Sequence, residues 1–270
     1  MLLQINYSVR SKRRNFSIEV GACTFYIDPL EMSRKSEYFE LLTTSKHFVE
    51  GISGKGCLHD ERDDIKHMLQ STCPTVYGIC PRMVRVQKIP SLARLADKYD
   101  IKTLQISCEL SAHRTDLRKH CNSLLVKLLQ TAMTYKYDKK LQESLMTELL
   151  NRAYFSNNYT TDKINNKMTK EIFAIILNCN TKHRGRAISE GLCHKCGKQK
   201  TAVISNTNGD NLWKCDWCET VFCLECKYMP CLEHVKELFQ VAFEKFEMEE
   251  RIENAKKYMT QQFSNIHTTY

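Results

Sequence analysis

The sequence predicts an α+β fold in which a small mixed domain is followed by helices, a cysteine-rich module and a terminal helix. Three observations support this prediction. Near the amino terminus, apolar and polar residues alternate, as in strands that bury one face. From about residue 117, leucine and isoleucine recur at intervals of three and four, as in amphipathic helices. Between residues 193 and 234, cysteine and histidine fall in regularly spaced pairs.

Residues 16–28 predict a two-stranded hairpin. Phe16, Ile18 and Val20 alternate with polar residues, Gly21 provides the turn, and the alternation then resumes. The proline directly after this segment suits the first turn of a helix, so we expect the chain to leave the hairpin into a helix.

Two later stretches of the same region predict helices. Apolar residues fall at helical spacing in residues 33–42, which read Ser-Arg-Lys-Ser-Glu-Tyr-Phe-Glu-Leu-Leu. Residues 92–104 are expected to form a pair of helices because of the family resemblance given next. We expect their apolar side chains to form a core that specifies a fold and carries no chemistry. These side chains are Tyr38, Phe39, Leu41, Leu42, Leu92, Leu95, Ala96 and Leu104.

Together these segments resemble a BTB/POZ domain over residues 14–112. The resemblance rests on the hairpin that ends in an aromatic residue and on the Ser-Glu-Tyr-Phe run at residues 36–39. It rests also on the Leu-Ala-Arg-Leu-Ala-Asp-Lys-Tyr run from Leu92, with Cys108-Glu109 after it. The two matches lie in the family's order, whereas the segment between them matches poorly.

The resemblance implies interaction rather than catalysis, because BTB domains generally act as dimerisation or adaptor modules. Family members that bind the ubiquitin-ligase scaffold cullin-3 carry a hydrophobic-x-acid motif after the helix that corresponds to the one predicted to end at Leu42. Phe48-Val49-Glu50 stands at that place. Phe48 and Glu50 are therefore candidate partner-binding residues, with an ordinary loop as the alternative. A homodimer formed through the BTB domain is the other implied contact.

The next part of the chain predicts a helical extension over residues 113–180, made of three amphipathic helices. A polar stretch at residues 156–166, rich in Asn and Thr, predicts the loop before the third helix. Residues 181–192 predict a basic linker. Its candidates for contact with nucleic-acid phosphates are Lys182, Arg184 and Arg186.

Residues 193–234 contain four Cys/His pairs, each with two intervening residues. This spacing is typical of a tight turn that directs two ligand atoms at one tetrahedral ion. Eight ligands complete two zinc sites and leave no open position for water or substrate, so both ions are expected to be structural. The predicted ligands are Cys193, Cys196, Cys215, Cys218, Cys223, Cys226, Cys231 and His234.

The spacing alone leaves open how the pairs share the two ions. In sequential sharing the first two pairs hold one ion, and the last two hold the other. In a cross-brace the first pair joins the third and the second joins the fourth. The run from Cys218 to Cys226 resembles the in-between-RING module, which shares its ions sequentially, and the cross-braced ZZ-type finger is also similar. Cys231-x-x-His234 departs from the in-between-RING pattern. We favour sequential sharing.

Residues 235–264 predict one helix with an apolar side, directly after the ligand His234. Two tryptophans, Trp213 and Trp217, flank the Cys215 pair. They either pack around the small zinc core or serve as exposed aromatic anchors for a partner.

Composition favours an intracellular chain in the cytoplasm or nucleus. Fourteen cysteines suit a reducing compartment, and no apolar run follows the basic residues near the amino terminus to form a signal peptide. No apolar run reaches the length of a membrane span, so no membrane is expected as a partner. The net charge of +9 permits contact with nucleic acid without requiring it.

These features predict a non-enzymatic protein-interaction adaptor. The amino-terminal domain would dimerise, bind cullin-3 or do both, and the zinc module would bind a client. The alternative is a nuclear regulator associated with nucleic acid or chromatin, which would use the zinc module and the basic linker. No phosphate-binding glycine loop, nucleophile motif or open metal site is present in the sequence, so we predict no catalytic residues.

Overall fold

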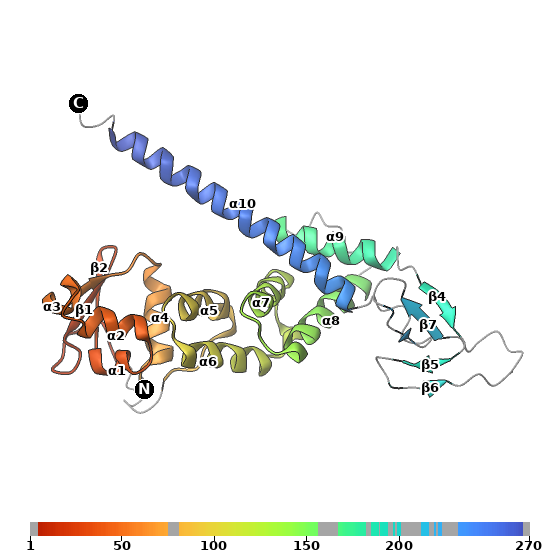
Figure 1. Cartoon of the computed structure of the whole chain (residues 1–270), viewed down its shortest axis with the longest axis horizontal. Coiled ribbons are helices and arrows are strands. Elements are labelled where there is room, and N and C mark those ends of the chain that lie inside the picture. The colour runs from red at the N-terminus through yellow and green to blue at the C-terminus, as the bar shows by residue number, and fades with distance from the viewer. Residues whose placement is uncertain are drawn as a thin grey trace, which may run out of the picture. The chain divides into compact units, whose positions relative to one another are not determined.

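A computed structural model of the chain is shown in Figure 1. It describes residues 5–74, 81–155, 167–181, 185–188, 190–193, 197, 199–200, 212–215, 219, 221–222 and 232–266. The chain divides into two compact units. Unit 1 contains residues 1–116 and 131–141, and unit 2 contains residues 117–130 and 142–270.

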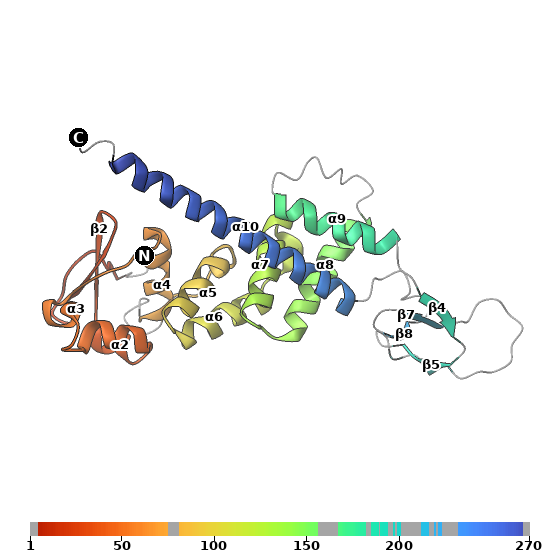
Figure 2. The ribbon, with the colours of Figure 1, turned by 45° about the horizontal axis from the view of Figure 1, so that its top comes forward.

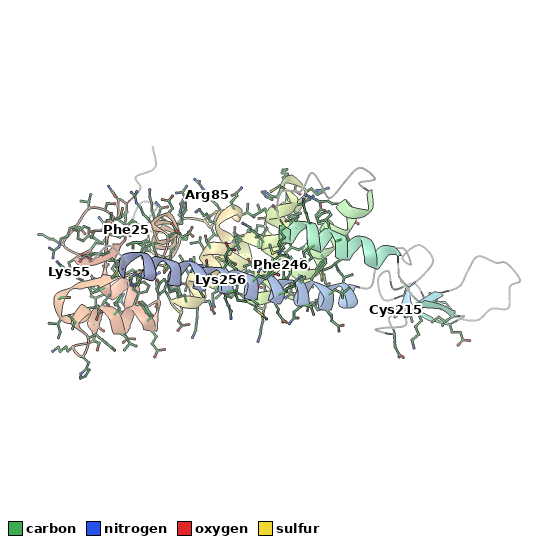
Figure 3. The ribbon with its side chains drawn as sticks, turned by 90° about the horizontal axis from the view of Figure 1, so that it is seen from above. Phe25, Lys55, Arg85, Cys215, Phe246 and Lys256 are labelled. Atoms are coloured by element: carbon green, nitrogen blue, oxygen red, sulfur yellow. The ribbon has the colours of Figure 1, made fainter. Side chains whose placement is uncertain are left out.

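Unit 1 contains a three-stranded sheet with the order β2-β1-β3. Strands β1 (Phe16–Val20) and β2 (Cys23–Ile27) form an antiparallel hairpin, which confirms the prediction. Gly21 makes the turn with a φ of 57°, in the left-handed region that glycine adopts without a steric penalty. Strand β3 (Lys55–Cys57) pairs in parallel with β1 and was not predicted. Figure 3 labels Phe25 on β2 and Lys55 on β3.

Helices make up most of the rest of unit 1. They are α1 (Pro29–Ser33), α2 (Glu37–Thr44), α3 (Val49–Ser53), α4 (Arg62–Thr72), α5 (Ile89–Lys98) and α6 (Lys102–His113). Helices α2 and α3 contact β3, and α4, α5 and α6 pack against one another. Helix α2 begins at a side-chain cap, because the Ser36 hydroxyl accepts a hydrogen bond from the Phe39 amide at 3.1 Å. The predicted helices are confirmed, with Ser36 separating the helix that starts at Pro29 from α2.

The core of unit 1 contains most of the residues that the sequence predicted for it. Phe39, Leu92, Leu95, Ala96 and Leu104 are buried: their residue accessibilities are 1% or less. The prediction was wrong for two residues of α2. Leu41 is 51% exposed, because α2 buries the face that contains Phe39 and Thr43. Tyr38 is 37% exposed, and one side of its ring lies against Tyr99, with 4.9 Å between the ring centroids.

The helical extension consists of α7 (Asn122–Thr134), α8 (Lys139–Phe155) and α9 (Lys167–Thr181). These are the three helices that the leucine and isoleucine spacing predicted. The polar loop at residues 156–166 lies outside the described residues. The described chain is therefore a helix-rich α+β protein. Within the described residues, no helix has the combination of length and apolar character that crossing a membrane requires.

Helix α10 (Leu232–Ile266) packs along α9 in unit 2 (Figure 2). Two ion pairs join them: Lys167 Nζ lies 2.8 Å from Glu249 Oε2, and Lys245 Nζ lies 3.2 Å from Glu171 Oε1. Helix α10 was predicted from residue 235. It begins three residues earlier, so the predicted ligand His234 lies within its first turn.

Candidate functional site

The first cysteine of each of the first two predicted pairs, Cys193 and Cys215, lies at the end of the first strand of a short hairpin. Strands β5 (Gly191–Leu192) and β6 (Gln199–Lys200) form the first hairpin, and β7 (Leu212–Cys215) and β8 (Val221–Phe222) form the second. Strand β4 (Gly185–Ile188) pairs with the outer side of β7. In both hairpins the first cysteine of a predicted pair therefore stands at the end of the first strand.

The first turn has a defined hydrogen bond. Cys193 follows β5 directly, and the Gly197 amide donates to the Cys193 carbonyl at 2.9 Å. Gly197 has a φ of 67°, which suits glycine, and a Cβ added there would meet no atom within 4 Å. Gly197, the residue that follows Cys196 in the sequence, therefore lies close to Cys193.

The second turn repeats this backbone conformation without a glycine. Cys215 is the last residue of β7, and Glu219, which follows Cys218, has a φ of 57°. A left-handed conformation costs a non-glycine residue about 1 kcal/mol or more, so the surrounding structure imposes it here. The Glu219 carboxylate lies 3.1 Å from Lys214 Nζ.

The two hairpins pack against each other around the first cysteine of each pair. Cys193 and Leu212 are fully buried in one apolar cluster, which Ile188 and Val221 cover from the side. A Cβ added to Gly191 would lie 3.4 Å from atoms of Leu212 and Val221, so β5 lies close to the second hairpin. Cys215 is also buried, and Figure 3 labels it in this module.

This environment suits a zinc–thiolate site. A thiolate buried among apolar side chains is costly unless a cation compensates its charge, and zinc bound by four cysteines provides that compensation. How the four pairs share the two ions stays a prediction, because the second cysteine of each of the first two pairs lies outside the described residues.

Five of the eight predicted ligands lie outside the described residues: Cys196, Cys218, Cys223, Cys226 and Cys231. His234 lies on α10, but its side chain is not among those described. Within the described part of the chain, no three His, Cys, Asp or Glu side chains gather in a group that could hold a metal ion.

The other predicted binding residues near this module are the two tryptophans and the three basic residues of the linker. Trp213 lies on β7 opposite Ala187 and Phe222, with its side chain outside the described set, and Trp217 lies outside the described residues. Lys182 and Arg184 also lie outside the described residues. Arg186 lies on β4 opposite Lys214, so part of the predicted basic linker forms strands of the module.

The predicted partner-binding residues of unit 1 lie at a surface of exposed apolar side chains. Phe48 is the residue before α3 and is 50% exposed, and Glu50 lies in the first turn of α3. Beside them, Val49 and Ile52 of α3 are 76% and 73% exposed. We call this set, together with two residues of α2, the α2–α3 surface. Its members are Tyr38, Leu41, Phe48, Val49, Glu50 and Ile52.

Helix α3 lies against the end of α2. A Cβ added to Gly51 would lie 2.1 Å from the Ser45 carbonyl oxygen, so only glycine permits this approach of α3 to the chain after α2. Burial raises the pKa of the Tyr38 hydroxyl, and the Glu50 carboxylate raises it further through its negative charge. Helices α2 and α3 contact each other, so the exposed residues of both helices belong to one surface.

The sequence identified Phe48 and Glu50 but missed four other residues of this surface. Tyr38 and Leu41 were assigned to the core, and Val49 and Ile52 were not singled out. Their signal is weak, because a five-residue helix is too short for its exposed face to be identified from periodicity.

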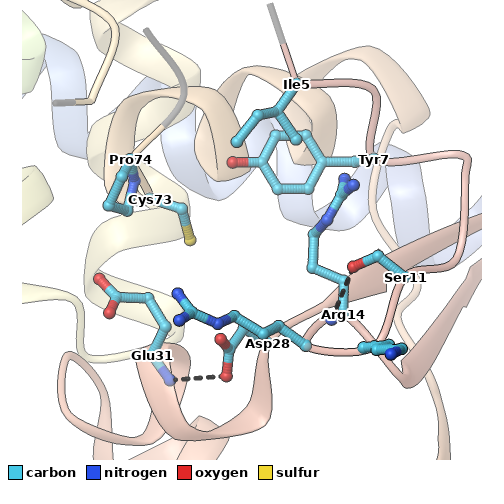
Figure 4. A pocket seen from close by; sticks show the side chains of 10 residues that line it. Ile5, Tyr7, Ser11, Arg14, Asp28, Glu31, Cys73 and Pro74 are labelled. Atoms are coloured by element: carbon cyan, nitrogen blue, oxygen red, sulfur yellow. Dashed lines mark hydrogen bonds between the residues drawn. The ribbon is translucent and has the colours of Figure 1, made fainter. Parts of the chain in front are cut away.

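A cavity of about 440 Å³ lies elsewhere in unit 1, between the amino-terminal segment and α1 (Figure 4). Its polar groups already have structural partners. The Asp28 carboxylate caps α1 by accepting from the Leu30 amide at 3.0 Å, and Arg14 Nη1 donates to the Asn6 carbonyl at 2.7 Å. Burial raises the pKa of the Cys73 thiol to about 12, so this cysteine is a neutral thiol at pH 7.

No protein-family model and no curated protein matches this chain. Its function is therefore argued from the α2–α3 surface and from the zinc module.

Proposed function

We propose that this chain is a non-enzymatic adaptor that binds one protein through the α2–α3 surface and another through the zinc module. The observation that carries the proposal is the group of apolar side chains on that surface. Val49 and Ile52 are about three-quarters exposed, and Phe48 and Leu41 are about half exposed. Clustered exposed apolar residues on a folded domain are typical of protein-binding sites.

The resemblance to BTB domains suggests the partner of the α2–α3 surface. In that family, cullin-3 recognises a hydrophobic-x-acid motif, and here Phe48 and Glu50 supply the two side chains. Apolar anchors that surround one carboxylate suit a partner that offers an apolar groove with a basic or hydroxyl group beside it. We therefore propose cullin-3 as the partner of unit 1.

The zinc ions have a structural role in this proposal. Cys193, Cys196, Cys215 and Cys218 would hold the first ion, and Cys223, Cys226, Cys231 and His234 would hold the second. Each ion would fix short strands that are too small to fold around a core of their own. The module would then present Trp213 and Trp217 to a client protein.

Affinity capture tests the proposal. The full-length chain and a Phe48→Ala/Glu50→Ala variant would be used as baits in cell lysate, and the zinc content of both would be measured. We expect cullin-3 with the wild type only, and two zinc ions in both. Ile106→Ala is the matched control, since Ile106 is 57% exposed on α6, outside the α2–α3 surface. Recovery of nucleic acid or chromatin proteins without cullin-3 would favour a nuclear regulator instead.

A further inference from the structure

Helix α10 has a second row of apolar side chains that is separate from its contact with α9. Val241, Met248 and Ile252 are 65%, 62% and 49% exposed. They are seven and four residues apart, so they lie on one side of the helix. Leu238 and Ala255 extend this side at both ends. We call these five residues, together with Lys245 between Val241 and Met248, the α10 stripe.

The α10 stripe points away from the face that packs on α9. The packing face contains the buried Phe239, Ala242 and Phe243, and the ion pair of Glu249 with Lys167 lies on the same side. At 100° per residue, the centre of the stripe is roughly 130° around the helix from the centre of that face. Figure 3 labels Phe246 and Lys256 on α10. Within the described part of unit 2, the stripe is a solvent-facing apolar row.

The stripe has the spacing of a two-stranded coiled coil. Leu238, Lys245 and Ile252 occupy one core position of successive heptads, and Val241, Met248 and Ala255 occupy the other. We propose that α10 binds α10 of a second copy of this chain in antiparallel orientation. Val241 would then pack against Ile252 of the second copy, and Leu238 against Ala255 of the second copy.

The flanking charges select the antiparallel orientation. Glu244 and Arg251 lie at the edge of the stripe that α9 leaves free, and both are exposed. In the antiparallel pair, Glu244 lies beside Arg251 of the second copy, and the two-fold symmetry repeats this attraction. In a parallel pair, Glu244 would face Glu249 and Arg251 would face Lys256, so both contacts would be repulsive.

Lys245 in the middle of the stripe is compatible with this contact. Its Nζ reaches sideways to Glu171 on α9 at 3.2 Å, so its charge is directed away from the row. Its aliphatic stem then covers the stripe between Val241 and Met248. In the antiparallel register the stem packs against Met248 of the second copy, whose unbranched side chain adapts to it.

Charge exchange tests the proposal in the full-length chain. Self-association would be measured by sedimentation velocity over a range of concentrations for Glu244→Arg, for Arg251→Glu and for the double variant. Each single change replaces two attractions by two repulsions, so we expect association to weaken by about tenfold. The double change restores the attractions in reversed order, so we expect wild-type association. Glu250→Arg is the matched control, because the exposed Glu250 lies on the side of α10 opposite the stripe.

The other outcomes overturn the proposal. Stronger association of Glu244→Arg would indicate a parallel pair, in which the new arginine faces Glu249. A double variant as weak as the single variants would exclude the antiparallel register. If the chain dimerised only through unit 1, the association constant would be the same in every variant. If the wild type were monomeric, the contact would be excluded altogether. Circular dichroism checks that all variants retain the wild-type helix content.

Discussion

The Asp60 carboxylate accepts a hydrogen bond from the Tyr99 hydroxyl, although the two residues are 39 positions apart in the chain. Lys98 Nζ also donates to Asp60 at 2.7 Å, and Arg94 Nη1 donates at 2.9 Å. The carbonyl of Tyr99 in turn accepts from the Ser36 hydroxyl at 2.5 Å, and Ser36 caps α2. Through Tyr99, Asp60 therefore links α5 to α2, the helix that contributes Tyr38 and Leu41 to the α2–α3 surface.

We expect Asp60→Asn to destabilise unit 1 by about 2 kcal/mol at pH 7, because it weakens three hydrogen bonds at a buried carboxylate. Burial alone would raise the pKa of Asp60, but the hydrogen bonds from Lys98, Tyr99 and Arg94 outweigh it and lower that pKa. A lowered pKa stabilises the folded state above the unfolded-state pKa of about 4, and this contribution is lost as the pH falls through the folded-state pKa.

Urea unfolding at several pH values measures this effect. The difference in unfolding free energy between wild type and Asp60→Asn should be largest near neutral pH and should shrink in acid. Asp97→Asn, at an exposed position of α5, is the matched control. A difference that does not change between pH 7 and pH 3 would contradict the role of the ionised carboxylate.

Gly51→Ala should displace α3 from the end of α2. The added Cβ would lie 2.1 Å from the Ser45 carbonyl oxygen, so the backbone must move. We expect a loss of about 1–3 kcal/mol of stability and a loss of cullin-3 binding. Thermal unfolding and a binding assay would be compared with Ser53→Ala, an exposed change in the same helix. Wild-type binding by Gly51→Ala would show that the position of α3 does not matter for the partner.

Substitution of Gly197 and substitution of Glu219, which hold equivalent positions in the two cysteine turns, should change the rate of zinc release in opposite directions. Gly197→Ala places a Cβ on a left-handed residue and should speed zinc release to a chelator, whereas Glu219→Gly removes such a strain and should slow it. Each effect is expected to be about 1 kcal/mol or threefold to tenfold in rate. Glu219→Gly also removes the ion pair with Lys214, and Glu219→Gln provides the control for that loss. Equal release rates in all three variants would count against zinc-binding turns.

Arg152→Lys should destabilise unit 2 by about 2 kcal/mol. The guanidinium of Arg152 donates to the carbonyls of His120 at 2.6 Å and Leu117 at 2.9 Å, and to the Asn122 side chain at 2.9 Å. Arg152 Nε also donates to the Glu148 carboxylate at 2.7 Å. A lysine has only three donors on a single nitrogen, so it cannot reach four acceptors that are arranged around a planar guanidinium. Hydrogen exchange would localise the effect to α7 and α8, and increased exchange confined to unit 1 would refute the assignment.

Local patterns allowed much of this architecture to be predicted. Pro29 and the Phe16–Val20 alternation act within a few residues of their own positions, so the hairpin and the first helix follow from the sequence. Spacing identified the pairs that begin at Cys193 and Cys215, and each of these two cysteines lies at the end of the first strand of a hairpin.

Features that depend on distant contacts could not be predicted. Strand β3 has three residues and forms only because β1 offers it a parallel partner. Leu41 looks like a core residue in the sequence, and its exposure depends on which face of α2 meets the sheet. The left-handed conformation of Glu219 has no sequence signal, because the residue type disfavours it.

The most direct test of the adaptor proposal is calorimetric titration of the purified chain with the purified amino-terminal region of cullin-3. We expect the wild type to bind, and Val49→Asp to bind at least about tenfold more weakly, because it places a charge in the centre of an apolar contact. Cys215→Ser should lose zinc and the fold of its module, yet bind like the wild type, because its change lies in unit 2. Failure of the wild type to bind, or equal binding by Val49→Asp, would contradict the proposed role of the α2–α3 surface.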